Sequence, residues 1–135
     1  MAKRLIDSTL FRKPLVRALD APSKLLWIYI QCECDHAGFW IPEMDVVASR
    51  LGVKMSEEKA LEKLEGLVRV MPAGEWWVVD FVPFQYGTLK PENRVHEAVM
   101  NLLSERGLLG QDQKPIYKPL TSPFQGAMDK ERDKE

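Results

Sequence analysis

Six consecutive apolar residues, LLWIYI at positions 25–30, constrain the fold more than any other feature of this sequence. They lie in a segment, 21–34, that is apolar nearly all round and that follows good helix-start signals, with Asp20 as the N-cap and Pro22 in the first turn. Such a helix needs apolar neighbours on all sides. We therefore expect a central, buried helix in a chain whose 135 residues suffice for one domain and a tail.

The same run is too short to cross a bilayer, which requires about 20 apolar residues. The N-terminal sequence MAKRLIDSTLFRK lacks the apolar core and the small-residue cleavage site of a signal peptide. With 45% hydrophobic and 29% charged residues, the composition is that of a soluble globular protein. We expect a cytoplasmic protein without a membrane partner.

Helix signals recur after the central segment. A very short strand is expected at 39–41, and a helix at 42–51, ended by Gly52. Ser56 is placed to cap a third helix, with glutamates in its first turn and one apolar face that extends to Leu67.

The hydrophobic period then changes from that of a helix to that of a strand. Residues 68–71 and 76–82 predict a β-hairpin around the turn Pro-Ala-Gly-Glu at 72–75. After a loop, helical spacing returns from Pro91 to Gly107.

This order of elements is that of a winged helix-turn-helix, a mainly α fold with a small β-hairpin (α+β class). Residues 42–67 would be the helix-turn-helix and the hairpin would be the wing. We predict a basic N-terminal arm at 1–20, the winged helix-turn-helix domain at 21–110, and a flexible linker and charged tail at 111–135.

Charge is distributed unevenly although the net charge is only −1. Residues 1–24 carry six Lys or Arg against two Asp, which gives +4, whereas residues 25–89 carry five basic against ten acidic residues, which gives −5. A basic N-terminal segment can lie along DNA phosphates. It can equally be a solvated arm that packs its apolar residues on its own core or on that of a neighbour.

The stretch CECDHAGFW at 32–40 raises the question of a metal or redox site. Cys32 and Cys34 are about 200° apart on a helix, and zinc sites normally use four ligands with paired spacings. We predict instead that Cys32 belongs to the core, that Cys34 is half-buried, and that Asp35 and His36 cap the helix end. No phosphate loop, nucleophile elbow or H-E-x-x-H motif is present, so neither an enzyme, a cofactor nor a metal is expected.

Four segments resemble phage and prophage replication-initiation proteins, also called replisome organisers. They are RLIDSTLFRKPLVRALDAPSKLLWIYIQCECDHAGFW, ALEKLEGL, WWVVDFVPFQYGTL and NRVHEAVMNLL, and the final MDKERDKE is similar to the charged linker of that family. The architecture is distantly similar to the N-terminal domain of the primosome protein DnaD. The resemblance implies a winged-helix domain that acts in replication initiation by binding DNA, by self-association, or by recruiting a helicase loader.

The expected groove-entering helix, SEEKALEKLEGL, has a net charge of −2, which is unfavourable beside phosphates. Two alternatives to a DNA-binding module of a replication initiator therefore stay open. One is a winged-helix interaction or oligomerisation module without DNA affinity. The other is a winged-helix transcriptional regulator, which would be a two-fold dimer on a palindromic site.

Candidate contact residues follow from these predictions. The candidates for DNA phosphates, from the arm and the helix-turn-helix, are Lys3, Arg4, Arg12, Lys13, Arg17, Arg50, Lys54, Lys59 and Lys63. Trp76 and Trp77 are adjacent on a strand, so one should face the core, and the other is a candidate for partner contact.

Overall fold

The computed structural model describes residues 3–112 and divides the chain after Gly87 into two compact units, which are described separately. The part described contains six α-helices, one short 3-10 helix (η1) and three strands. Their order is η1 Leu10–Arg12, α1 Pro14–Arg17, α2 Ala21–Glu33, β1 Phe39–Trp40, α3 Met44–Leu51, α4 Glu57–Lys63, β2 Val68–Val70, β3 Trp76–Val78, α5 Phe81–Tyr86 and α6 Arg94–Glu105. This combination is compatible with the predicted α+β class.

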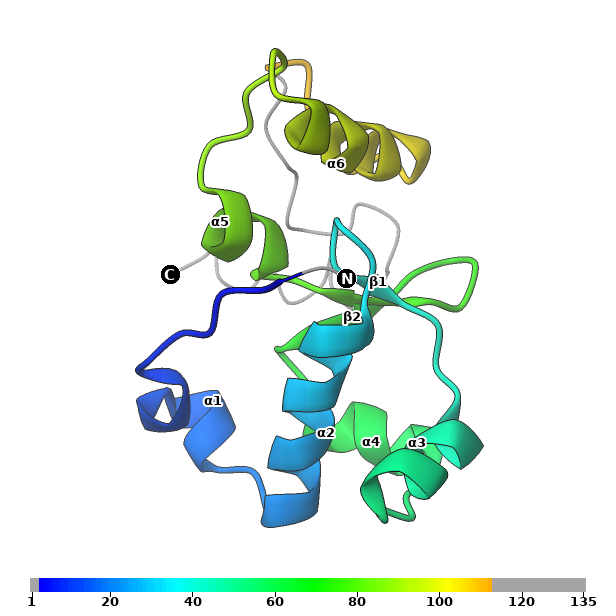
Figure 1. Ribbon diagram of the computed structural model, residues 1–135. Helices are drawn as coiled ribbons and strands as arrows, with labels where there is room; N and C mark the ends of the chain where they lie inside the picture. The colour runs from blue at the N-terminus through cyan, green and yellow to red at the C-terminus, as the bar shows by residue number, and fades with distance from the viewer. Residues whose placement is uncertain (1–2, 113–135) are drawn as a thin grey trace, which may run out of the picture. The chain divides into compact units, whose positions relative to one another are not determined.

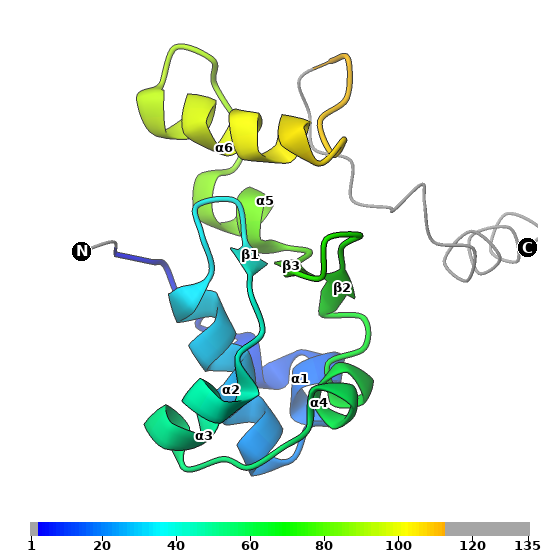
Figure 2. The ribbon, with the colours of Figure 1, turned by 90° about the vertical axis from the view of Figure 1, so that its right-hand side faces the viewer.

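Helix α2 is the centre of the first unit (Figure 1). Asp20 caps it as predicted, because its Oδ1 accepts from the amide of Ser23 at 2.9 Å. Hydrogen bonding by Ser23, through its side chain and then its amide, lowers the pKa of the Asp20 carboxyl. Figures 1 and 2 show α1, α3 and α4 around the N-terminal half of α2, and the sheet at its C-terminal end.

Helices α3 and α4 lie where the helix-turn-helix was predicted, but both are shorter. Helix α3 begins at Met44, so Pro42 is not its first residue, and it ends at Gly52 in a left-handed conformation, as predicted. Ser56 caps α4 as predicted, since its Oγ accepts from the amide of Lys59 at 3.1 Å. The predicted helix to Leu67 was wrong beyond Lys63.

The sheet has the strand order β1-β3-β2 and both pairings are antiparallel. Trp40 pairs with Trp76, and Trp76 with Val70 on its other side. The prediction that one of the two adjacent tryptophans would be exposed was wrong. Trp76 and Trp77 both have 0% of their surface exposed, although strand alternation points them to opposite faces.

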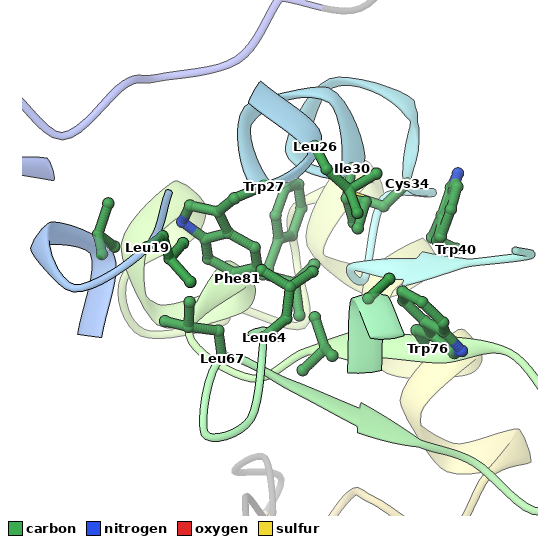
Figure 3. Packing of buried hydrophobic residues seen from close by; sticks show 14 of the residues in the cluster. Leu19, Leu26, Trp27, Ile30, Cys34, Trp40, Leu64, Leu67, Trp76 and Phe81 are labelled. Carbon is green, nitrogen blue, oxygen red and sulfur yellow. The ribbon is translucent and has the colours of Figure 1, made fainter. Parts of the chain in front are cut away.

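The main hydrophobic core lies between α2 and the sheet. Figure 3 shows side chains from the N-terminal helices, α2, α4, the sheet and α5 directed into one cluster. Leu26, Ile30 and Leu64 are fully buried in it, and Trp40 packs edge-on against Trp76 with ring centroids 5.2 Å apart. The predicted helix is central to this core, but it is not buried on all sides, because Leu25 is 42% exposed and Ile28 and Tyr29 are only half-buried.

Two predictions about the region after the hairpin were wrong. The second strand ends at Val78, and residues 81–86 form the helix α5 where we expected strand and loop. Pro83 is tolerated there because it occupies the first turn, where a backbone N–H has no intrahelical partner.

The second unit contains α6, which begins at Arg94 and not at Pro91. Asn93 is its N-cap, and its Oδ1 accepts from the amides of Val95 and His96. Gly107 follows the helix end with a φ of 68°, as expected for a helix stop. Of the predicted linker and tail, residues 113–135 lie outside the described part of the chain.

No helix between residues 3 and 112 is long and apolar enough to cross a membrane.

Candidate nucleic-acid interface

The N-terminal segment is held against the first unit by Arg4. Its Nη1 donates to the carbonyl of Gln31 at 2.8 Å and lies 3.2 Å from Sγ of Cys34. Its guanidinium carbon lies 4.9 Å from the ring centroid of Phe81, which is a cation–π contact. Arg4 therefore caps a free carbonyl in the last turn of α2 and is a poor candidate for phosphate contact in this arrangement.

Gln85 holds the same segment by its backbone. Its Oε1 accepts from the amide of Leu5, and its Nε2 donates to the carbonyl of Leu5, both at 2.9 Å. This is the hydrogen-bond pattern that a neighbouring strand would offer. Leu5 and Ile6 are thus fixed in backbone position while their side chains are 62% and 77% exposed.

The CECDHAGFW stretch forms a turn and carries no metal site in the structure. Asp35 Oδ1 accepts from the amides of Ala37 and Phe39, so it bonds amides just beyond the helix end and organises the turn. Tyr86 anchors the turn by donating to the carbonyl of His36 at 2.7 Å. Within residues 3–112, no three His, Cys, Asp or Glu side chains are grouped so that they could hold a metal ion.

The predicted burial of the two cysteines was wrong, since Cys32 is exposed and Cys34 is buried. Cys32 is two residues beyond the buried Ile30, which places it on the opposite face of α2. Burial raises the pKa of the Cys34 thiol to about 12, although the nearby guanidinium of Arg4 favours the thiolate. The thiol therefore stays protonated and unreactive at neutral pH.

Three basic residues lie in or between η1 and α1. Arg12, Lys13 and Arg17 are all exposed. Lys13 is paired with Asp7, with Nζ 2.9 Å from Oδ2, whereas Arg12, Arg17 and the exposed Lys3 have no ion pair within the described residues. The last three are free to meet phosphates.

Asp7 provides a direct measure of the Lys13 contact. Hydrogen bonds from Lys13 and then from Thr9 lower the pKa of Asp7 from 3.8 to about 2. Because the folded pKa of Asp7 is depressed, ionised Asp7 stabilises the fold above pH 3.8, and this contribution is lost as the pH falls through about 2.

We expect Lys13→Met to return the pKa of Asp7 toward 3.8 in an NMR titration of its carboxyl carbon. Arg12→Met, the matched control, should leave the pKa unchanged; an equal rise in both variants would contradict the specific contact.

Of the candidate cations in the predicted helix-turn-helix, two are ion-paired with acidic side chains and two are not. Arg50 donates to Tyr29 Oη at 3.0 Å and to Glu33 at 3.2 Å, while Lys63 lies 3.6 Å from Asp20. Lys54 and Lys59 are exposed, and in the part of the chain the structure describes they have no ion pair.

Acidic side chains surround Lys59 on the open face of α4. Glu57, Glu58 and Glu62 are exposed there, and Glu65 follows the helix. The β2–β3 hairpin offers little compensation, because Arg69 is its only Lys or Arg and is half-buried. Among residues 3–112, three of the cations without an ion pair, Lys3, Arg12 and Arg17, belong to the N-terminal segment, whereas Lys59 of α4 has exposed acids on the same helix.

Sequence reasoning missed the roles of Arg4 and Gln85 in holding the N-terminal segment. The available signal was the resemblance, because both residues lie in segments that carry it, RLID and FQYG. These two segments are 80 residues apart in sequence and meet at Leu5 and Gln85.

Comparisons of the chain with protein-family models, with curated proteins and with solved structures find no match.

Proposed function

We propose that this chain is a non-catalytic DNA-binding and assembly module of a phage-type replication initiator, built on a winged helix-turn-helix. The observation that carries the proposal is the order α2-β1-α3-α4-β2-β3 together with the sheet order β1-β3-β2. In a winged helix the first strand pairs with the last, beside the hairpin. The resemblance of four segments to replisome organisers supports replication initiation as the process.

Duplex DNA is contacted mainly by the N-terminal segment in this proposal. Lys3, Arg12 and Arg17 have no counter-charge there among residues 3–112, and Lys54 adds a further such cation at the turn between α3 and α4. Phosphate neutralisation releases counterions and needs no particular base sequence. The acidic face of α4 supports little readout by that helix, so modest sequence preference is expected.

The contribution of the arm is tested by fluorescence anisotropy of a labelled duplex across a salt series. Each phosphate contact contributes about 0.9 to the slope of log K against log salt concentration. We expect Arg12→Gln/Arg17→Gln to weaken binding and to reduce that slope by up to about 2. The matched control, Lys90→Gln/Arg94→Gln, removes two exposed cations of the second unit and should leave the slope unchanged. Equal slopes for wild type and the arm variant would show that the arm does not touch DNA.

An interaction module without DNA affinity is the second candidate, and it is favoured by one observation. Glu57, Glu58 and Glu62 are exposed on α4, and among residues 3–112 they have no ion-pair partner. Such a helix suits a basic protein partner better than a nucleic acid. Absence of binding to duplex and single-stranded DNA even at low salt would favour this candidate, and sedimentation would then test self-association.

A further inference from the structure

The exposed apolar residues of the N-terminal segment are unusual because their backbone is fixed. Leu5 and Ile6 expose 62% and 77% of their surface, yet Leu5 is bonded at both its amide and its carbonyl by Gln85. The preceding residue, Arg4, is held by three contacts to α2 and α5. Figure 1 shows this segment passing α5 in extended form. Two large aliphatic side chains are therefore presented to the outside from a rigid support.

Cations accompany these two side chains. Lys3 precedes them, and the Lys13–Asp7 pair joins the start of α1 to the residue that follows Ile6. Arg12 stands beside Lys13 without a counter-charge in the described part of the chain. Asp7 is the one acid next to Ile6, and Lys13 neutralises it. The segment that carries the apolar pair thus also carries Lys3 and Arg12, two exposed cations without an ion pair among residues 3–112, and such a charge suits a polyanion.

We propose that Leu5 and Ile6 form an apolar wedge that enters the minor groove of duplex DNA and kinks it, while the neighbouring cations hold the phosphates. Minor-groove proteins insert Leu, Ile or Phe between base steps and bend the duplex by about 20–90°. Unstacking a base step costs a few kcal/mol. A wedge on a fixed backbone loses little conformational freedom on insertion, so more of the binding energy is left to offset that cost. The inference rests on the proposed DNA binding and adds DNA bending to it.

Gln85 is the positioning residue in this mechanism. It does not reach DNA itself, because both ends of its amide are bonded to Leu5. Its removal frees the segment without changing a charge or the wedge side chains. The loss of Gln85 should therefore reduce bending more than it reduces the salt dependence of binding.

The test is energy transfer between dyes on the two ends of a duplex of about 30 base pairs, at saturating protein. Wild type should raise the transfer efficiency. Leu5→Ala/Ile6→Ala should bind with an unchanged salt slope but without the rise, and Gln85→Ala should give an intermediate rise. Ile41→Ala is the matched control, because it removes an aliphatic side chain that is 69% exposed elsewhere in the first unit. It should bend DNA like wild type.

A duplex with one mismatched pair gives a second readout, because its step is easier to unstack. Wild type should prefer it to the matched duplex by several-fold, and the Leu5→Ala/Ile6→Ala variant should lose that preference.

Three outcomes would overturn the wedge. In one, wild type binds DNA without bending it, and in another the double variant bends it as well as wild type. In the third, the double variant changes sedimentation but not bending, which would assign the two side chains to a protein partner. A different result is that the anisotropy of the labelled duplex does not change when protein is added at low salt. That result would overturn DNA binding itself.

Discussion

Replacing Trp76 by alanine should lower the free energy of unfolding by about 3–5 kcal/mol. The side chain is 0% exposed and packs edge-on against Trp40 in the main core. Alanine would remove one of the three indole rings from the cluster between α2 and the sheet and leave a cavity that small shifts cannot fill. Since domains of this size are stable by only about 5–15 kcal/mol, the variant should be close to unfolding. Urea denaturation followed by far-UV circular dichroism measures the loss.

Two variants make the Trp76 result specific. Trp76→Phe should lose much less, because it keeps an aromatic ring beside Trp40 and removes an indole N–H that has no hydrogen-bond partner among residues 3–112. Ile41→Ala, at an exposed site, should change stability by no more than about 0.5 kcal/mol. A Trp76→Ala protein as stable as Ile41→Ala would mean that the core is not centred on this strand.

The second large effect is expected at Gly38, in the turn between α2 and β1. Its φ is +95°, and an added Cβ would lie 2.8 Å from Cβ of Phe81 and 3.2 Å from the carbonyl oxygen of Val78. Gly38→Ala therefore combines a strained backbone, which costs about 1–3 kcal/mol, with a contact that forces the core to shift, which costs about as much again. The expected loss in unfolding free energy is about 2–5 kcal/mol in total.

Gly74 separates these two causes. Its φ is +100°, nearly that of Gly38, but nothing lies within 4 Å of the position of an added Cβ. Gly74→Ala should therefore show the backbone strain alone. The difference between the two variants in the same denaturation experiment measures the contact with Phe81 and the sheet. Equal losses would mean that α5 is not packed against this turn.

Local signals in the sequence predicted the start of α2, the end of α3 and the start of α4. Asp20, Ser56 and Gly52 act within three or four residues of their own position, through a side-chain hydrogen bond or a left-handed backbone. Such interactions need no knowledge of the rest of the chain. The central position of α2 was also predictable from its apolar run, although the structure leaves Leu25 on its outer side 42% exposed.

Helix α5 could not be predicted in the same way. The run WWVVDFVPF reads as one apolar strand with a proline at its end. In the fold, three residues of α5 contact distant partners. The guanidinium of Arg4 lies over the ring of Phe81, Gln85 is hydrogen-bonded to Leu5, and Tyr86 donates to the carbonyl of His36. Contacts between residues that are 50 to 80 positions apart in the sequence do not produce a helical hydrophobic pattern in a short segment.

For the candidate interface, too, the sequence predicted some properties and only the fold decided others. Counting charges identified a basic N-terminal segment and an acidic body. It could not tell that Arg4 is used inside the fold, that Lys13 is paired with Asp7, or that Arg12 and Arg17 have no ion pair within residues 3–112. Whether a cation is available depends on which acid or carbonyl the fold brings within about 4 Å of it.

The sequence by itself determined the central helix, the caps that begin and end its neighbours, and the opposite charges of the N-terminal segment and the body. These properties arise from periodicity, composition and contacts within one helical turn. Only the tertiary structure decided that both Trp76 and Trp77 are buried, that residues 81–86 are helical, and that the N-terminal segment is fixed by Gln85. Those outcomes depend on surfaces and hydrogen-bond partners that come together only when distant parts of the chain have folded.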